Sequence, residues 1–154
     1  RATAVFRRDI AAPLAFEVSR QMRISQVTID GEPAEIFQRE SLRSNLIRGR
    51  DSDAFLVIPS KSLRAGETHE IEFRHEGAVV SRAGNGVYYV SARGSWYPQH
   101  GIQYSTYDLT FRYPTELNLV ATGTIAEEHI EADWKVTRRT VNAPVRLVSF
   151  NLGD

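Results

Sequence analysis

A chain of 154 residues, 42% of them hydrophobic, suits one domain over residues 1–154 that can bury a core without cross-links. Its 19 Lys and Arg balance 19 Asp and Glu, which argues against a nucleic-acid partner because phosphate binding needs a basic face. The absence of cysteine excludes disulfides, thiol nucleophiles and cysteine-ligated zinc. Because no apolar run reaches about 18 residues, we expect no transmembrane segment.

The first part of the chain shows the pattern of short β-strands. Residues 14–18 and 22–29 carry apolar side chains two positions apart, which is the period of a half-buried strand. Asp30 and Gly31 follow, and because both residue types tolerate positive φ they predict a hairpin turn. Pro33 has no N–H to donate, so we expect the return segment at a sheet edge or at a strand start.

The middle of the chain contains one polar stretch and two clear strand patterns. Residues 39–53 are the most polar, and their spacing leaves a weak helix, a loop and a short strand all open. Residues 55–58 form a continuous apolar run closed by Pro59, which favours a buried strand. Residues 69–75 alternate up to Gly77 and predict a further strand.

Strand patterns return after a second turn signal. Gly-Asn-Gly at residues 84–86 predicts a turn, and a short aromatic strand is expected over residues 87–90. Residues 107–113 alternate without a break and end at Pro114. A further strand is predicted over residues 117–121.

The last part of the chain is less regular. Residues 125–131 fit neither the helical nor the strand period. Strands are predicted over residues 134–137 and 145–152, with a turn at residues 142–144 between them. In total, roughly ten short strands and little helix predict an all-β fold, in which two antiparallel sheets form a two-layer β-sandwich.

Two His-Glu pairs raise the question of a zinc site. His69-Glu70 and His75-Glu76 both lack the second histidine that a zinc-binding helix places one turn later. In a strand, residues four positions apart are separated by about 13 Å and cannot hold one ion. The acidic run at residues 127–131 is expected to be a solvated charged surface. We therefore expect no catalytic residue, metal or cofactor within this chain.

Aromatic residues support a competing hypothesis. Trp96 and Tyr97 precede Pro98, and this aromatic–proline corner could present two rings at the surface. The other candidates for a sugar-stacking platform are Tyr88, Tyr89, Tyr104 and Trp134. Large aromatic residues of all-β domains more often cover the core. The competing function is a stand-alone Ig-like, carbohydrate-binding or peptide-binding module of the cell envelope.

A series of motifs runs through the chain in order. They are Val27-Thr28-Ile29-Asp30-Gly31, the strand Phe55 to Pro59, the turn Leu63 to Gly66, Ile71-Glu72-Phe73 before Gly77, the strand Val87 to Val90, the corner Trp96-Tyr97-Pro98, the strand Tyr107 to Pro114, the segment Leu117 to Gly123 and the tail Trp134 to Gly153. This order resembles the N-terminal domain of the aminopeptidase N-type zinc metallopeptidases, or gluzincins, in a divergent bacterial form.

The resemblance implies a saddle-like β-sandwich that packs on the catalytic domain of the same polypeptide. In that family the zinc and the catalytic residues belong to the next domain, so we expect them beyond Asp154. The chain is then a fragment of a longer multidomain protein, a zinc-dependent aminopeptidase-like hydrolase with a peptide substrate. Divergent bacterial members often carry leaders, which favours a periplasmic, secreted or membrane-anchored parent over a cytoplasmic one.

The resemblance also suggests residues for the substrate cleft. In family members a polar side chain between the aromatic strand and the proline corner can enter the pocket for the first residue of the substrate. Ser91 and Arg93 are the candidates in this sequence. One departure concerns the Asp-Glu-Pro-like triplet that often follows the corner, since Gln99 to Ile102 stand there instead.

Overall fold

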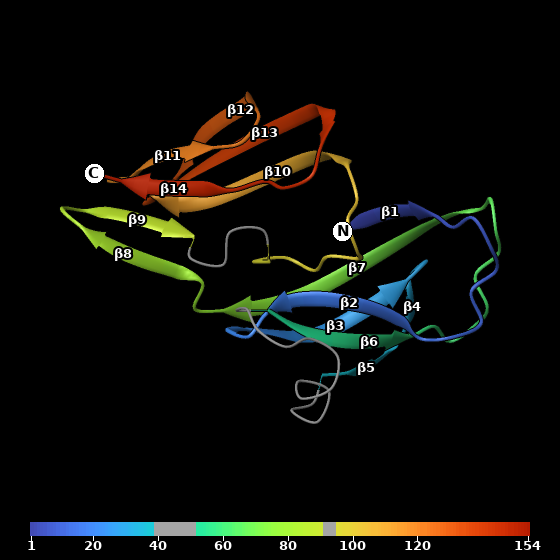
Figure 1. The fold of residues 1–154 in the computed structure, drawn as a ribbon. Helices are drawn as coiled ribbons and strands as arrows, with labels where there is room; N and C mark the ends of the chain where they lie inside the picture. The colour runs from blue at the N-terminus through green and yellow to red at the C-terminus, as the bar shows by residue number, and fades with distance from the viewer. Residues whose placement is uncertain (39–51, 91–94) are drawn as a thin grey trace. The chain divides into compact units, whose positions relative to one another are not determined.

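The computed structural model describes residues 1–38, 52–90 and 95–154. These ranges contain fourteen strands and no helix, and every strand pairing is antiparallel (Figure 1). Within them, accordingly, no helix is long and apolar enough to cross a membrane. The predicted all-β class is confirmed, with the strands arranged in several antiparallel sheets consistent with a β-sandwich. The polar stretch at residues 39–51 lies outside the described residues.

The chain divides into two compact units, and we describe each by itself. Unit 1 comprises residues 1–79 and 95–101, and unit 2 comprises residues 80–94 and 102–154. The interpretation of residues 1–154 as a single domain stays a prediction.

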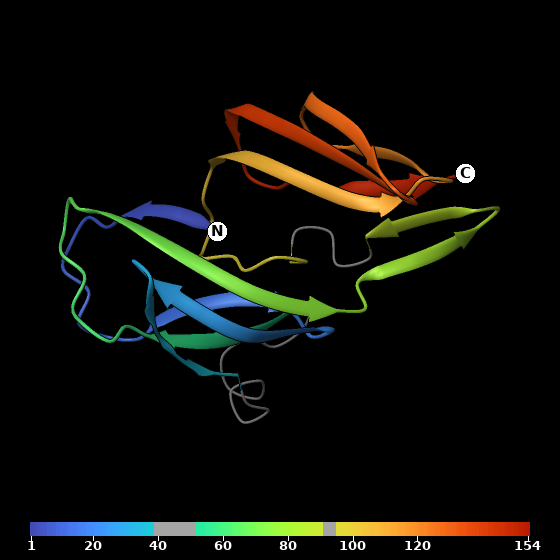
Figure 2. The ribbon, with the colours of Figure 1, turned by 180° about the vertical axis from the view of Figure 1, so that it is seen from behind.

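Unit 1 contains two sheets. The four-stranded sheet has the order β1 (Ala2–Val5), β7 (Thr68–Gly77), β3 (Met22–Ile29) and β4 (Glu32–Pro33). The three-stranded sheet has the order β2 (Leu14–Ser19), β6 (Ser52–Ile58) and β5 (Glu35–Phe37). Figure 2 shows β7 as the long strand that pairs with both β1 and β3.

Aromatic side chains join the two sheets of unit 1. Phe16 on β2 and Phe55 on β6 lie with ring centroids 5.6 Å apart. Phe73 on β7 meets Phe16 edge-on at 5.0 Å, so one ring cluster contains side chains of both sheets. Because each buried aromatic ring removes about 150–250 Å² from water, this cluster is a large part of the core. The alternation predicted for residues 14–18 is therefore that of a half-buried strand, as expected.

The predicted hairpin turns are confirmed. Asp30 and Gly31 connect β3 to β4 with φ of 52° and 82°, and Asn85 and Gly86 connect β8 (Val80–Gly84) to β9 (Val87–Val90) with φ of 48° and 70°. Two consecutive positive φ angles match the right-handed twist of the flanking strands, which is why these residue types are favoured there. Pro33 lies in the edge strand β4, where its missing N–H breaks no ladder.

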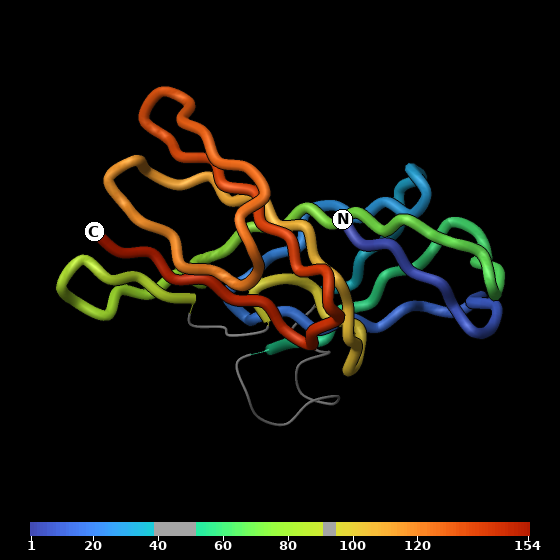
Figure 3. The backbone as a smooth tube through the Cα atoms, turned by 90° about the horizontal axis from the view of Figure 1, so that it is seen from above, coloured from blue at the N-terminus to red at the C-terminus, as the bar shows by residue number. Residues whose placement is uncertain are grey.

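Unit 2 also contains two sheets. The three-stranded sheet has the order β10 (Ser105–Pro114), β13 (Trp134–Val145) and β12 (Thr124–Glu131). The four-stranded sheet has the order β11 (Asn118–Ala121), β14 (Phe150–Gly153), β9 and β8. Figure 3 shows the β8–β9 hairpin beside the C-terminal strand β14.

The inner face of the three-stranded sheet carries the alternating side chains predicted for β10. Tyr107, Leu109, Phe111 and Tyr113 are less exposed than Asp108, Thr110 and Arg112 between them. Phe111 contacts Phe150 of the four-stranded sheet, with ring centroids 5.3 Å apart. Tyr113 is buried, and its hydroxyl lies 2.9 Å from the Thr137 hydroxyl.

The turn predicted at residues 142–144 is wrong. These residues belong to β13, where the register jumps from Tyr107↔Val141 to Ser105↔Val145 and so forms a bulge. A bulge leaves residues out of the ladder, so Pro144 fits without an N–H to donate. The strand predicted over residues 145–152 is shorter than expected, because β14 begins only at Phe150.

Candidate functional site

The predicted cleft region is described only in part. Ser91 and Arg93 lie outside the described residues. The aromatic–proline corner that follows them, residues 95–101, is described and belongs to unit 1.

Backbone hydrogen bonds hold the corner along β2. The Glu17 N–H donates to the Gln99 carbonyl and the Gln99 N–H donates to the Glu17 carbonyl, both at 2.8 Å. The Ser19 N–H donates to the Ser95 carbonyl at 2.7 Å. Because β6 occupies the other edge of β2, the corner acts as a further partner for this strand. Its backbone position is therefore fixed by strand pairing.

Side chains of the corner are also tied to unit 1. Trp96 and Tyr97 are half-buried, and their rings meet edge-on with centroids 4.7 Å apart. The His100 Nδ1 lies 2.8 Å from the Ala15 carbonyl and can donate a hydrogen bond to it. Burial lowers the pKa of His75, although a hydrogen bond with the Trp96 backbone acts in the opposite direction. The corner thus presents a pair of aromatic rings on a rigid backbone.

The six aromatic residues considered for a platform do not share one surface. Tyr88 and Tyr89 are consecutive in β9, so their side chains leave opposite faces of the sheet. The Arg112 guanidinium lies 4.3 Å from the centroid of the Trp134 ring and covers it. A continuous stacking surface would need neighbouring rings on one face.

A buried histidine pairs with the β3–β4 turn. His69 on β7 is 5% exposed, and its Nδ1 lies 2.8 Å from Asp30 Oδ2. The other Asp30 oxygen accepts a hydrogen bond from the Glu70 N–H at 2.8 Å. The hydrogen bond between the two side chains lowers the pKa of Asp30 and raises the pKa of His69.

This pair was missed at the level of sequence. The alternation over residues 69–75 places His69 on the same side as Ile71, and an inward-facing histidine needs a polar partner. That signal shows that a partner exists, but it does not identify Asp30.

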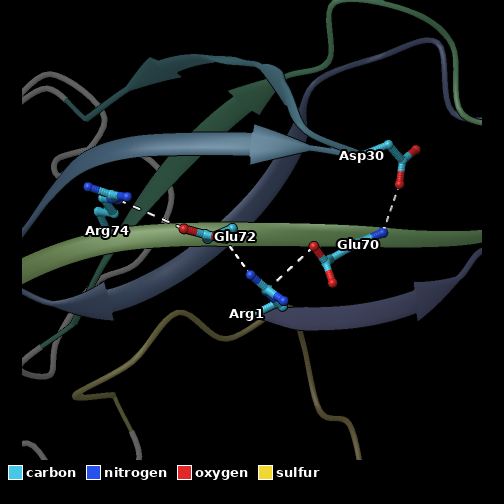
Figure 4. A network of polar contacts seen from close by, with 5 residues as sticks. All are labelled: Arg1, Asp30, Glu70, Glu72 and Arg74. Carbon is cyan, nitrogen blue, oxygen red and sulfur yellow. Dashed lines mark hydrogen bonds and ion pairs between the residues drawn. The ribbon is translucent and has the colours of Figure 1, made fainter.

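Exposed ion pairs surround the same strand. Arg1 contacts Glu70 at 3.5 Å and Glu72 at 3.2 Å, and Arg74 contacts Glu72 at 3.8 Å (Figure 4). These side chains are largely open to solvent, so each pair contributes little to stability. In the described ranges, no three His, Asp or Glu side chains are arranged to hold a metal ion.

The outer faces of the two sheets of unit 2 differ in charge. On the three-stranded sheet the outward side chains form the charged face: Asp108, Thr110, Arg112, Thr124, Glu127, His129, Glu131, Trp134, Val136, Arg138 and Thr140. On the four-stranded sheet the outward positions form the uncharged face: Ser81, Val87, Tyr89, Asn118, Val120, Asn151 and Gly153. On the uncharged face, Val120 is 71% exposed and Val87 and Tyr89 are each 42% exposed.

Comparison with known proteins identifies the fold. No family model and no curated protein matches the sequence. A mutant of a two-domain M1 zinc metallopeptidase bound to L-arginine matches with a TM-score of 0.78 and 15% identity, over 98% of this chain and 36% of that chain. The M1 zinc metallopeptidase from Deinococcus radiodurans matches with a TM-score of 0.75 and 16% identity over the same shares. Native yeast LTA4 hydrolase matches with a TM-score of 0.59 and 20% identity, over 94% of this chain and 24% of that chain.

These matches concern the fold, because the identities are low. The chain spans about a third of the length of the M1 zinc metallopeptidases that it matches. The predicted resemblance is confirmed at this level. Over nearly its whole length, the chain has the fold of the N-terminal region of M1 zinc metallopeptidases.

Proposed function

We propose that this chain is a non-catalytic, N-terminal accessory domain of a larger zinc metallopeptidase. In this role it packs on a catalytic domain of the same polypeptide and shapes the cleft that receives a peptide substrate. Zinc and the catalytic side chains belong to that second domain. The chain itself contributes a docking surface for that domain and part of the wall of the cleft.

One observation carries this proposal. The fold matches cover 98% of this chain but 36% of the M1 zinc metallopeptidase chains, one of which is described as a two-domain enzyme. Because this chain matches one region of a longer enzyme over nearly its whole length, we infer that it has the role of that region.

The uncharged face supports the packing role. Exposed sheet faces of isolated domains are normally polar or charged, whereas Val87, Tyr89 and Val120 are exposed here on a face whose described strand positions have no charged side chain. The Lys135 ammonium, from the other sheet, reaches Asn118 at the edge strand. Apolar surface without charge is characteristic of interaction surfaces. We assign the catalytic domain to this face.

The aromatic–proline corner supports the cleft role. Backbone hydrogen bonds to β2 hold Ser95 and Gln99, and the corner lies shortly after Ser91 and Arg93 in the sequence. In the family that the sequence resembles, the polar side chain of the cleft comes from the segment between the aromatic strand and this corner. We propose that Ser91 and Arg93 line the cleft of the parent enzyme, next to the first residue of the substrate.

The test starts from the gene. The parent reading frame beyond Asp154 is expected to encode a His-Glu-x-x-His helix and a downstream glutamate, which together bind zinc. The full protein should then cleave peptides in a manner that a chelator abolishes. Residues 1–154 alone should bind no stoichiometric zinc and cleave nothing. A frame without that motif, or equimolar zinc in the isolated chain, would contradict the proposal.

The competing hypothesis, a stand-alone binding module, makes a different prediction. Glycans or short peptides added to residues 1–154 would change the fluorescence of Trp96 and saturate. The accessory-domain proposal predicts no saturable response from the isolated chain, and Trp96→Phe serves as the control that assigns the signal.

A further inference from the structure

The His69 imidazole lies between two groups that can only accept hydrogen bonds. Its Nδ1 is 2.8 Å from Asp30 Oδ2, and its Nε2 is 3.4 Å from the Arg64 carbonyl oxygen. A neutral imidazole has one N–H and can satisfy one acceptor, whereas the imidazolium ion donates from both nitrogens. The geometry is therefore complete only when the ring carries two protons.

The Arg64 carbonyl belongs to the turn between β6 and β7, and other bonds tie this turn to the segment after β1. Leu63 and Ile10 exchange two backbone hydrogen bonds, of 2.8 and 2.9 Å. The Gly66 N–H donates to the Phe6 carbonyl at 3.0 Å. His69 is the side chain that links this pair of segments to Asp30 at the end of β3.

We propose that His69 acts as a pH-dependent latch. While its ring is doubly protonated, His69 holds the turn at residues 62–66 against β7 and the β3–β4 turn. When the ring loses one proton, the turn is released. On deprotonation the remaining N–H stays with the Asp30 carboxylate, the better acceptor. The bare Nε2 lone pair then faces the lone pairs of the Arg64 carbonyl oxygen. That contact is repulsive, so the turn separates from the ring.

The charged groups around the ring favour this assignment. Asp30 faces it from the β3–β4 turn, and Glu67 acts on it from the residue before β7. Lys61 acts on Asp30 from the β6–β7 turn, and the Phe6 ring covers the imidazole with centroids 6.0 Å apart. The hydrogen bond with Asp30 raises the pKa of His69, while burial opposes this shift.

The sign of the pH dependence follows. A histidine with a raised pKa in the folded state contributes stability that is fully present below its ordinary value of 6.5 and is lost as the pH rises through the raised value. The latch is closed in mildly acidic solution and open in alkaline solution.

Amide hydrogen exchange of residues 1–154 between about pH 5 and about pH 9 tests the latch. After correction for the intrinsic exchange rate, protection of the Leu63 and Gly66 amides should fall about two- to tenfold as the pH rises, the factor that one hydrogen bond is worth. The Glu17 and Gln99 amides, which pair elsewhere in unit 1, should keep their protection. Constant protection of Leu63 and Gly66 across this range would overturn the proposal.

Two variants separate the latch from other effects. His69→Gln cannot change its charge, so protection of Leu63 and Gly66 should lose its pH dependence. Asp30→Asn keeps a residue type that tolerates the positive φ of this turn but removes the negative charge, so the step should move to lower pH. A pH step that survives His69→Gln, or a midpoint unmoved by Asp30→Asn, would overturn the proposal. His129→Gln, at an exposed histidine of unit 2, is the matched control and should leave the step unchanged.

Discussion

The two outer faces of unit 2 have the same secondary structure and opposite character. The charged face of β10, β13 and β12 contains ion pairs between strands, such as Arg138 with Asp108 at 2.9 Å on adjacent strands and Arg112 with Glu131 at 3.8 Å across the central strand β13. The uncharged face of β11, β14, β9 and β8 presents Val120, Val87 and Tyr89. A sheet face that stays in water is expected to carry charge, and this difference is the reason for proposing that the uncharged face is the one that docks.

A substitution in the inner layer between these faces should have the largest effect on the free energy of unfolding. Tyr113 is 5% exposed and bonded to Thr137, and Tyr113→Ala should lower the free energy of unfolding by about 3–5 kcal/mol, because it leaves a cavity the size of a ring. Urea denaturation measures this change. Tyr113→Phe, which keeps the ring, should cost about 1 kcal/mol. An equal cost for the two variants would mean that the hydroxyl bond, rather than ring packing, holds the layer.

A charge on the uncharged face should weaken docking and spare folding. Val120 lies on the edge strand β11 and is 71% exposed, so Val120→Asp should cost at most about 1 kcal/mol in unfolding free energy. With residues 1–154 and the remainder of the parent made as separate chains, the same variant should weaken their association at least tenfold, or about 1.4 kcal/mol.

Thr110→Asp is the matched control for that experiment. It adds the same charge on β10, also an edge strand, but on the charged face. Its association with the remainder of the parent should equal that of the unchanged chain. If both variants weaken association alike, the contrast between the faces has no role in docking.

On the charged face, removing the stacking of Arg112 on Trp134 should have a smaller effect on the free energy of unfolding. The guanidinium lies 4.3 Å from the ring centroid, and Arg112→Gln should lower the free energy of unfolding by about 0.5–1 kcal/mol. The indole N–H signal of Trp134 in NMR spectra should shift at the same time. Arg82→Gln, on β8 of the other sheet, is expected to leave that signal in place.

Removing the ion pair of Asp108 and Arg138 should have the smallest effect on stability. The hydrogen bonds from Arg138 hold the pKa of Asp108 below its ordinary value of 3.8. This contribution to stability is present above the ordinary value and is lost as the pH falls through the lowered value. Arg138→Gln should raise the pKa of Asp108, and salt should reduce the difference between the two chains. A carboxyl titration by NMR that is the same in both would contradict this origin.

Much of the fold was predictable because its signals are local. Residues 107–113 alternate in sequence and in exposure, because successive side chains of a strand leave opposite faces. The turns at Asp30-Gly31 and Asn85-Gly86 required positive φ, which few residue types accept.

Two segments that were predicted wrongly or left open have side chains that are all exposed, residues 125–131 and residues 142–144. All eight residues of β12 are exposed, so residues 125–131 show no period, and the strand forms because β13 offers a partner edge. Residues 142–144 carry turn chemistry, but the pairing on either side absorbs them as a bulge. In both places, the neighbouring strand rather than the local sequence determines the structure.

The sequence alone determined the strand periods, the hairpin turns and the order of motifs, because each depends on a few consecutive residues. It also placed Trp96 and Tyr97 at a corner, which the structure anchors on β2, while Ser91 and Arg93 stay candidates. Tertiary structure decided which strands became neighbours, which sheet face was left without charge, and that His69 meets a carboxylate 39 positions away. Those features depend on pairing between distant segments, and hydrophobic alternation is the same whichever partner a strand selects.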